Sequence, residues 1–406
     1  MKRYRILYAA VESGPREIPA RVMLARRLRD MGWVSVIGHK TVVDAVMRKG
    51  PPGVYLYKNT HKPALDRFRI AKDRGNLTLA CEEEILNFVA EDILSLTAKH
   101  YQCDSDVMNH VDLYMGSNLA DEAIYDSHSL GHDKFVRSGN LRIAYSAQVA
   151  DIRRLPKSDV HQRLLINGRL GAVTGPSISD LIGFSSNVVG FDTALDEIQK
   201  FVTEEWGVFR EIIKIARVAA PVYDVIFRKH PAEYLKLYRM ALGDSVKYDE
   251  GKGPVQHHFP NINTVVGFSC TTLVEAALAG VSVVNLGNVR PSHLSDVAIS
   301  KISSDDFFRH NSTSVIDFDR LNFELYQPQM ILDRWLDMFS TFKFDLLAIK
   351  NPITLPQIDL DVYTLERFGC YTKEMLELDL FKEDLSDRLS GGAVAYSLSP
   401  LGVCVW

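Results

Sequence analysis

The sequence lacks the features of a membrane-spanning or exported protein. No stretch approaches the ~18 consecutive apolar residues of a transmembrane helix, and the charged N-terminus has no apolar segment of the kind found in signal peptides. The cysteines are scattered and form no CxxC pair, as expected for reduced thiols; they are Cys81, Cys103, Cys270, Cys370 and Cys404. We therefore expect a cytoplasmic protein.

The sequence also has little excess charge of either sign. Lys and Arg number 47 against 51 Asp and Glu, which gives a formal net charge of −4 and no overall electrostatic reason to bind nucleic acid. The first thirty residues are an exception, because basic residues outnumber acidic ones there. Such an excess is typical of a solvated helix face, and the alternative is a surface that approaches an anionic ligand or lipid headgroups.

Motifs that identify several common enzyme classes are absent. The phosphate-binding patterns GxGxxG and GxxxxGK[ST] do not occur, and the GxSxG pattern that supplies a hydrolase nucleophile is missing as well. His257 and His258 form an isolated pair, and no Asp-x-Asp follows a predicted strand. We therefore expect neither a metal site nor a cofactor.

The sequence does contain repeated alternation of apolar strands and amphipathic helices. In the first half, strands are predicted at 4–11, 34–38, 53–58, 77–81 and 110–117, with helices over 18–31 and 64–74. The second half repeats this alternation around a long helix at 194–219, with strands at 164–168, 223–231, 262–272 and 281–287. Strand and helix alternation of this kind indicates an α/β protein with doubly wound, mostly parallel sheets.

The length of the chain favours two domains, since single cores rarely grow beyond about 250–300 residues. Residues 146–163 are polar and lack a clear apolar period, so we place the crossing between domains there. The predicted division is an N-terminal acceptor-side domain at 1–155, a C-terminal nucleotide-sugar domain at 156–340, and a segment at 341–406 that packs across both.

The segment "VVGFSCTTLVEAALAG" predicts a strand, a hydroxyl-rich turn and a helix. The turn offers Ser269, Thr271 and Thr272 at a helix N-terminus, where backbone N–H groups and the helix dipole favour phosphate. Glu275 lies one helical turn further on, so its carboxylate can reach the sugar hydroxyls of a bound nucleotide. The alternative is that Thr271 only caps the helix and Glu275 is an ordinary surface acid.

The segment "IFRKHPAE" predicts a strand that ends in Arg228, Lys229 and His230, with Pro231 stopping the ladder. In parallel sheets such strand ends point to the ligand-binding edge, as does the strand ending at Asn167. His230 could hydrogen-bond a departing phosphate or donate a proton to it. The alternative is that His-Pro is only a turn.

Two clusters in the first half place charge at strand ends. Glu12, Arg16 and Glu17 follow the first strand and suit a polyhydroxylated acceptor or an acidic sugar; the alternative is that Glu17 caps the following helix. Glu82–Glu84 follow another strand, where neighbouring like charges raise a carboxyl pKa towards the acid/base range. Glu83 is a candidate catalytic residue and Glu84 a candidate acceptor ligand, unless the cluster is a solvated face.

Together these segments resemble a family. "ESGPREIPARVMLARRLRDMGWVSVIG", "DRGNLTLACEEEI", "VRSGNLRI", "LLINGRLG", "RKHPAE" and "SCTTLVEAALAGVSVVNLG" resemble, in order, motifs of bacterial surface-carbohydrate glycosyltransferases of the GT-B architecture. The group includes the β-Kdo transferases of lipopolysaccharide O-antigen and capsule assembly. The resemblance covers about residues 5–290.

The resemblance implies two Rossmann-like domains facing across a cleft, and Kdo transfer from CMP-Kdo to a saccharide acceptor without a metal. His230 matches the family's His-Pro motif. The nucleotide-sugar-binding set implied by motif and strand position is Arg228, Lys229, Ser269, Thr271, Thr272, Glu275 and Asn167. Arg16 or Lys229 would pair with the donor's carboxylate.

The chain departs from the family at two points. Asn140-Leu141-Arg142 stands where the family often has Asn-Pro-Arg, and Ala232 stands beside the His-Pro where a carboxylate nucleophile is needed for a retaining transfer. Other candidate nucleophiles or bases are Glu233, Glu17, Glu83 and Asp192. A further hypothesis is that Ala232 replaces a natural aspartate, which Ala232→Asp would test through a gain in transfer from CMP-Kdo.

Other functions remain open from the sequence. One alternative is a nucleotide-sugar epimerase or a CDP-glycerol-type phosphotransferase, and another is a non-catalytic module that binds nucleotide sugars. The partners expected are a nucleotide-sugar donor and a saccharide or lipid-linked acceptor. Peripheral contact of the basic N-terminal helix with the inner membrane is a secondary prediction.

Overall fold

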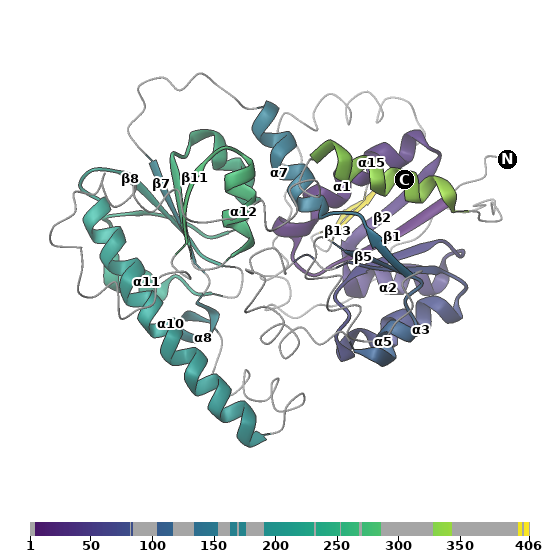
Figure 1. The fold of residues 1–406 in the computed structure, drawn as a ribbon, viewed down its shortest axis with the longest axis horizontal. Helices are drawn as coiled ribbons and strands as arrows, with labels where there is room; N and C mark the ends of the chain where they lie inside the picture. Colours follow the sequence, from purple (N-terminus) through teal and green to yellow (C-terminus); the bar gives the residue numbers. More distant parts are fainter. Residues whose placement is uncertain are drawn as a thin grey trace. The chain divides into compact units, whose positions relative to one another are not determined.

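The computed structural model describes the parts of the chain that carry its strands and most of its helices. These are residues 5–81, 83, 104–116, 134–152, 163–168, 170–175, 191–230, 233–251, 253–267, 270–285, 328–342, 397–399 and 402–405. The chain forms two compact units, of which the first comprises Met1–Gln148 with Asp317–Trp406 and the second Val149–Ile316. Figure 1 shows the sheet and helices of each.

The first unit is built on a mostly parallel sheet with strand order β12-β13-β2-β1-β3-β4-β5-β6. Strands β1 to β6 are parallel, whereas β13 runs antiparallel to β2. The bounds are β1 Arg5–Val11, β2 Trp33–His39, β3 Val54–Lys58, β4 Leu77–Cys81, β5 Leu113–Gly116, β6 Phe135–Arg137, β12 Ser397–Ser399 and β13 Gly402–Val405.

Helices cover both faces of this sheet. Their bounds are α1 Gly14–Asp30, α2 Lys40–Lys49, α3 Leu65–Asp73, α5 Ser105–Asn109 and α15 Pro328–Thr341, with the 3-10 turn η1 at Lys62–Ala64. The helix α7, Leu141–Ile152, contains the division between the two units. Apolar residues of α2, α3 and α5 share one core with alternate residues of β1 and β3. α15 packs beside β2 and the end of β6, since Phe339 meets the ring of Trp33 and Trp335 donates to the carbonyl of Gly139 at 3.1 Å.

The sequence explains why the first strand and helix form where they do. β1 is apolar and buried along nearly its whole length, as expected for a parallel strand covered on both faces. α1 begins with Pro15 in its first turn, where a missing N–H costs nothing, and has Arg27 and Arg29 in its last turn. Gly32 follows with a φ of +82°, a conformation that glycine adopts without strain.

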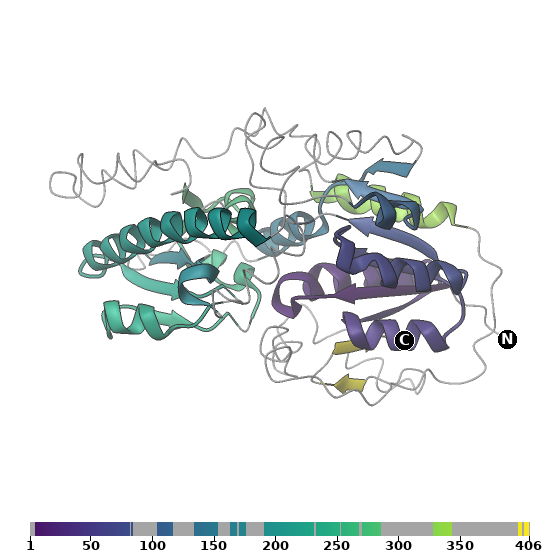
Figure 2. The same ribbon diagram turned by 90° about the horizontal axis from the view of Figure 1, so that it is seen from below.

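The second unit is a smaller doubly wound sheet with strand order β11-β10-β7-β8-β9, all paired in parallel. α10 and α11 pack on one face, and α12 with the 3-10 turns η4 and η5 packs on the other (Figure 2). The bounds are β7 Arg163–Asn167, α8 Gly171–Thr174, α10 Phe191–Ala219, β8 Asp224–Arg228, α11 Lys236–Leu242, β9 Lys247–Asp249, η4 Val255–His257, η5 Phe259–Asn261, β10 Thr264–Gly267, α12 Thr271–Leu278 and β11 Ser282–Asn285.

The predicted fold class, α/β with two doubly wound Rossmann-like units, is confirmed. Several local predictions need correction, among them the strand predicted at 262–272, which ends at Gly267 before α12 begins at Thr271. Part of the segment 146–163 is helical, because α7 runs to Ile152; the strand predicted at 223–231 ends at Arg228; and β13 adds an antiparallel strand that the sequence pattern did not reveal. The division between the units falls after Gln148, inside the predicted crossing, and α15 belongs to the first unit. No helix in the described part of the chain is long and apolar enough to cross a membrane.

Candidate functional site

Each sheet has one position at which its strand order reverses. Ligands of open α/β sheets bind beyond the carboxyl ends of the strands at such a position. In the first unit the reversal lies between β1 and β3, and in the second unit between β7 and β10. The residues at these two edges therefore form two candidate sites, one in each unit.

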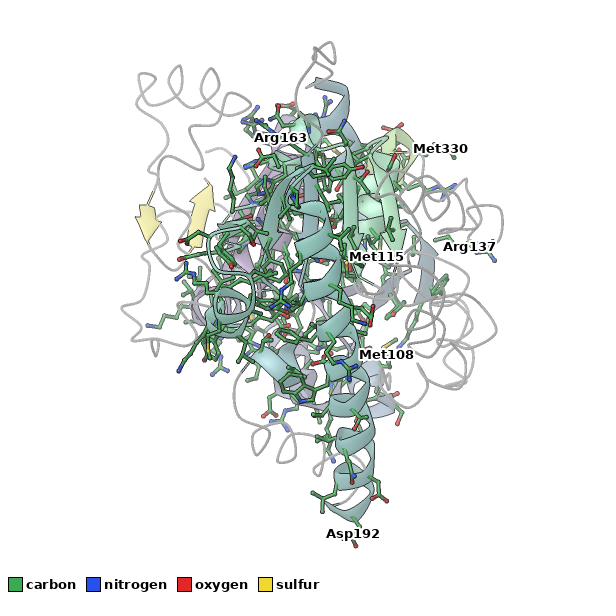
Figure 3. The ribbon with its side chains drawn as sticks, turned by 90° about the vertical axis from the view of Figure 1, so that its left-hand side faces the viewer. Met108, Met115, Arg137, Arg163, Asp192 and Met330 are labelled. Atoms are coloured by element: carbon green, nitrogen blue, oxygen red, sulfur yellow. The ribbon has the colours of Figure 1, made fainter. Side chains whose placement is uncertain are left out.

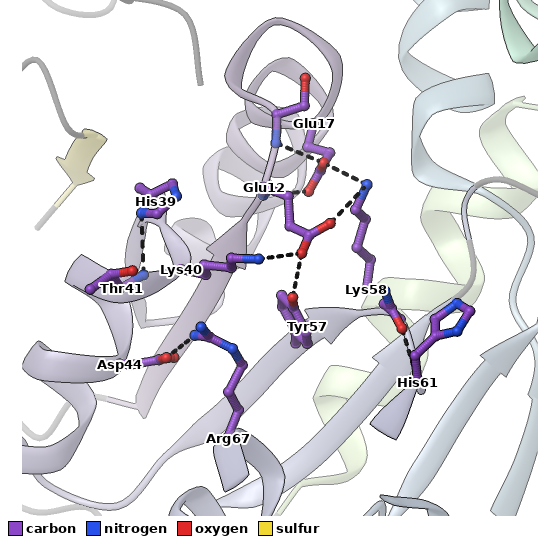
Figure 4. A network of polar contacts seen from close by, with 12 residues as sticks. Glu12, Glu17, His39, Lys40, Thr41, Asp44, Tyr57, Lys58, His61 and Arg67 are labelled. Atoms are coloured by element: carbon purple, nitrogen blue, oxygen red, sulfur yellow. Dashed lines mark hydrogen bonds and ion pairs between the residues drawn. The ribbon is translucent and has the colours of Figure 1, made fainter. Parts of the chain in front are cut away.

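Glu12 is the hub of the first edge. It directly follows β1, and its Oε1 accepts hydrogen bonds from the Lys40 Nζ and the Tyr57 hydroxyl, each at 2.6 Å (Figure 4). Its Oε2 lies 3.6 Å from the Nζ of Lys58, the last residue of β3. Three elements thus bring opposite charges and a phenol together at the carboxyl ends of β1 and β3.

These contacts shift the acidity of the groups involved. Burial raises the pKa of Glu12, but the charges of Lys58 and Lys40 and the hydrogen bonds from Lys40 and Tyr57 outweigh it and lower the pKa to about 2. Burial raises the pKa of Tyr57 above its ordinary value, and the neighbouring Glu12 carboxylate raises it further. At neutral pH the edge therefore presents an ionised carboxylate between two ammonium groups and a neutral phenol.

Glu17 faces inward and holds the start of α1. Its carboxylate accepts the backbone N–H of Ser13 at 3.0 Å and of Glu12 at 3.2 Å, and it pairs with Lys58 at 3.0 Å. This is the capping arrangement that the sequence left open as the alternative to catalysis. Arg16 is half-buried in the first turn of the same helix.

Glu83 lies in a buried ion pair after β4. Its Oε1 is 2.8 Å from Nη2 of Arg21, a residue of α1 with no exposed surface, and the same Nη2 lies 3.3 Å from Cys81 Sγ. A buried arginine needs such a partner, because an uncompensated charge in the interior is costly. This pair joins α1 to the end of β4.

The second edge brings the ends of β7 and β10 together. Asn167 ends β7, and its Nδ2 lies 3.4 Å from Sγ of Cys270, which precedes α12. Cys270 occupies the N-cap position, and its side chain makes no capping hydrogen bond to the helix. Thr271 is buried and Thr272 half-exposed, and both lie in the first turn of α12, so Thr271 is not the N-cap residue that the sequence left open as an alternative. The start of the helix, with the positive end of its dipole, faces this edge.

Glu275 and Arg228 have protein partners in the structure. Glu275 is fully buried and accepts a hydrogen bond from Gln256 Nε2 at 3.3 Å. Arg228 donates to the Asp249 carboxylate and to the carbonyl of Gly253, and His258 Nε2 lies 2.7 Å from the same Asp249 oxygen. Burial raises the pKa of Asp249, but the hydrogen bond from His258 and the charge of Arg228 together hold it below its ordinary range.

His230 follows β8 by two residues and is partly exposed. Its backbone N–H donates to Glu233 Oε2 at 2.6 Å, and its backbone carbonyl accepts the N–H of Glu233 at 2.9 Å. Lys229 lies between the strand and His230 and lines a hollow of about 540 Å³ along α11.

Other predicted site residues lie elsewhere or are not described. Asp192 is exposed at the N-terminal end of α10 (Figure 3). Ser269, Glu84 and Ala232 lie outside the described residues. Within the described part of the chain, no three His, Cys, Asp or Glu side chains are placed to hold a metal ion. The functional roles assigned from the sequence therefore stay predictions, now with positions for most of the residues.

Several residues at the two edges were not singled out by sequence reasoning. They are Lys40, Tyr57, Lys58, Gly168 and Gln256. Lys58 carried a usable signal, since it is the charged last residue of an apolar strand in a parallel sheet. Lys40 and Gln256 carried none, because only the packing of neighbouring segments brings them to Glu12 and Glu275.

Comparison with known proteins finds similarity in structure only. No model of a protein family matches the chain, and no curated protein matches it. UDP-GlcNAc 2-epimerase of Methanocaldococcus jannaschii, in complex with UDP-GlcNAc and UDP, is 12% identical with a TM-score of 0.50, over 84% of this chain and 99% of that one. This likeness establishes a GT-B-like fold.

Two further solved structures are less similar. UDP-GlcNAc 2-epimerase of Neisseria meningitidis, bound to UDP-GlcNAc, is 11% identical with a TM-score of 0.48 and covers 84% of this chain and 99% of its own. The wall teichoic acid polymerase TagF is 10% identical with a TM-score of 0.40, over 82% of this chain and 89% of its own.

Proposed function

We propose that the chain is an enzyme that acts on a nucleotide-activated sugar and that the second unit binds the nucleotide. The observation that carries the proposal is the contact of Asn167 with Cys270 at the reversal of strand order, directly at the start of α12. A helix start at that position supplies N–H groups and a favourable dipole for phosphate. The GT-B-like fold supports the proposal.

We propose further that the reaction is transfer of a 2-keto sugar acid, Kdo from CMP-Kdo, to a saccharide acceptor of a bacterial surface polysaccharide. The resemblance of the sequence motifs supports this donor. His230, partly exposed beyond β8, would hydrogen-bond the leaving phosphate or protonate it. Lys229, adjacent to it, would pair with donor anionic groups.

The first edge would bind the sugar or acceptor. Glu12 is ionised and partly exposed between Lys40 and Lys58, and such paired charges bind hydroxyl groups as both donors and acceptors. We therefore propose Glu12 for acceptor hydroxyls, with the partly exposed Lys40 beside it to pair with a sugar carboxylate. The buried, ion-paired Glu17 and Glu83 would instead support this edge as structural residues.

The second candidate is epimerisation of a UDP-sugar. The observation that favours it is the fold shared with the archaeal epimerase, which was solved with UDP-GlcNAc and UDP. An epimerase needs no acceptor, so incubation with the nucleotide sugar alone would yield an isomer. A transferase would release free nucleotide only when an acceptor is supplied.

The decisive experiment is a thermal-shift comparison of CMP, CDP, UDP, GDP and their sugars, because a ligand that binds only the folded state raises the melting temperature. We expect CMP and CMP-Kdo to give the largest shifts. Preferential stabilisation by UDP or UDP-GlcNAc would replace the donor assignment by the epimerase candidate. Binding without turnover, with or without acceptor, would favour a non-catalytic nucleotide-sugar-binding module.

We also propose peripheral membrane contact through α1, where Arg26 is half-buried and Arg27 exposed. Replacing both by Glu should abolish binding to vesicles that contain anionic lipid, because each basic residue near such a surface contributes about 1 kcal/mol. The matched control is Arg48→Glu with Lys49→Glu, an equal charge change at exposed positions of α2. Equal loss of binding in both variants would contradict a specific role for α1.

A further inference from the structure

The Glu233 carboxylate is surrounded by donors from three different segments. Its Oε2 accepts the N–H of His230 at 2.6 Å, and its Oε1 accepts the N–H of Leu170 and the hydroxyl of Tyr238, the latter at 3.0 Å. Leu170 lies in the turn after β7, and Tyr238 in α11. The side chain is 1% exposed. One carboxylate therefore ties the loop after β8 to the turn after β7 and to the following helix.

The sequence makes room for this carboxylate at Gly168. A Cβ at position 168 would stand 2.1 Å from Glu233 Oε2, far inside any real contact. The backbone N–H of Gly168 also donates to the carbonyl of Arg228 at 2.8 Å, which carries the β7–β8 pairing one residue beyond β7. The Glu233 carboxylate can therefore occupy its position only because residue 168 has no side chain.

These contacts leave Glu233 badly placed for chemistry of its own. Both oxygens are occupied by donors, and burial raises its pKa even though the backbone N–H groups of His230 and Leu170 act against that shift. His230, in contrast, is partly exposed, and its backbone is held on both sides by Glu233.

We propose that Glu233 is a positioning residue, which fixes the backbone of His230 against the turn after β7 and so presents the imidazole to the donor phosphate. This inference rests on the proposed function, because it assumes that His230 acts on that phosphate. It differs from the sequence-based prediction of Glu233 as a catalytic group. A displacement of about 1 Å in a catalytic group can cost about 100-fold in rate.

The test compares Glu233→Gln with a matched control. Glu233→Gln keeps the shape but turns one acceptor into a donor that faces a backbone N–H. Glu205→Gln is the control, since Glu205 is also buried in the second unit and accepts a backbone N–H, that of Val173 at 3.1 Å. With CMP-Kdo and acceptor, we expect kcat to fall about 10- to 100-fold in Glu233→Gln, with the Kd for CMP changed less than about threefold. Glu205→Gln should change neither.

Two further variants separate positioning from catalysis. Gly168→Ala, which crowds the carboxylate without removing it, should reproduce the loss in kcat. In a His230→Ala background, Glu233→Gln should cause no additional loss, because a residue that acts only through His230 has nothing left to position. A further loss of tenfold or more in that background would show that Glu233 acts independently of His230 and would overturn the inference.

Amide hydrogen exchange tests the arrangement without any substrate. Glu233→Gln should lower the protection of the His230 and Leu170 N–H groups, whereas Glu205→Gln should leave both unchanged. Unchanged protection in Glu233→Gln would refute the inference. If wild-type protein bound no nucleotide while protection fell as expected, the proposed function would fail and the Glu233 contacts would stand as purely structural.

Discussion

Glu12 shows how one carboxylate can serve the fold and remain available to a ligand. Lys40, Lys58 and Tyr57 approach it from three elements, yet about a fifth of its side chain stays exposed. Glu17 and Glu83 lie at the same edge of the sheet but are almost fully buried. At the residue scale, burial is therefore what separates a candidate ligand-binding carboxylate from a supporting one.

The depressed pKa of Glu12 predicts acid sensitivity. Its folded-state pKa of about 2 lies below the ordinary 4.5, so the ionised group stabilises the fold above about pH 4.5, and this contribution is lost as the pH falls towards 2. The lowered pKa of Glu12 contributes about 3 kcal/mol to the free energy of unfolding when the carboxylate is ionised. The free energy of unfolding of wild type minus that of Glu12→Gln, measured in urea between pH 6 and pH 3, should shrink as pH falls.

The control for this measurement is Asp30→Asn. Asp30 lies in the same unit and is largely exposed beside Arg29. The free energy of unfolding of Asp30→Asn should stay within about 0.5 kcal/mol of the wild-type value over the same pH range, as for most surface substitutions. A constant difference between wild type and Glu12→Gln would contradict the role given to Lys40 and Lys58.

At the scale of the element, the start of α12 carries the nucleotide proposal. Thr272 is half-exposed in the first turn. Thr272→Asp should slightly favour the helix, since acidic groups suit its N-terminus, but should repel a bound phosphate. We expect at least a tenfold weaker Kd for CMP by calorimetry, without loss of melting temperature.

The control is Thr203→Asp, a similar change at an exposed position of α10. It should leave the Kd unchanged. If Thr272→Asp binds CMP as tightly as wild type, the phosphate does not lie at this helix start.

The β8–β9 pair depends on a buried ion pair. Arg228 and Asp249 end neighbouring strands, and removing Arg228 takes away the permanently charged partner of the Asp249 carboxylate, which keeps His258 beside it. Arg228→Met should therefore lower the free energy of unfolding by about 3 kcal/mol or more. Lys247→Met, which removes an exposed partner of Asp224 in the same strand pair, should cost less than about 1 kcal/mol. Urea titrations compare the two, and equal costs would contradict the structural role of Arg228.

At the scale of the whole molecule, each unit has its own buried core. The first core joins β1 to β5 with α2, α3 and α5, and the second unit has cores on both faces of its sheet. Independent cores predict two thermal transitions in calorimetry. Arg228→Met should lower only one of them, and a bound nucleotide should raise that same transition.

The transition of the first unit can be assigned separately. Tyr55→Phe removes the buried hydroxyl that donates to Asp44 at 2.6 Å and should lower only the other transition. A single transition that shifts equally with both variants would show that the units unfold together.

The sequence predicted much of the fold because its signals are local. The apolar runs around 4–11, 53–58 and 281–287 and the glycine at position 32 mark strands and a helix end wherever they fold. The motif around Thr271 was likewise placed at a strand end and a helix start, as the structure has it. Other elements were missed, among them α2, α7, α11, β9 and β13.

What the sequence determined by itself is therefore the order of the main strands and the longest helices, and many of the polar residues at the carboxyl ends of the parallel strands, since both follow from hydrophobic period and strand polarity. Only the tertiary structure decided which of those carboxylates face solvent. The orientation of Glu17, Glu83 and Glu233 depends on partners far away in the chain, among them Lys58, Arg21 and Leu170. A pattern of residue types cannot show whether such a donor is within reach. The donor decides the orientation, because burying a carboxylate without a partner is energetically costly.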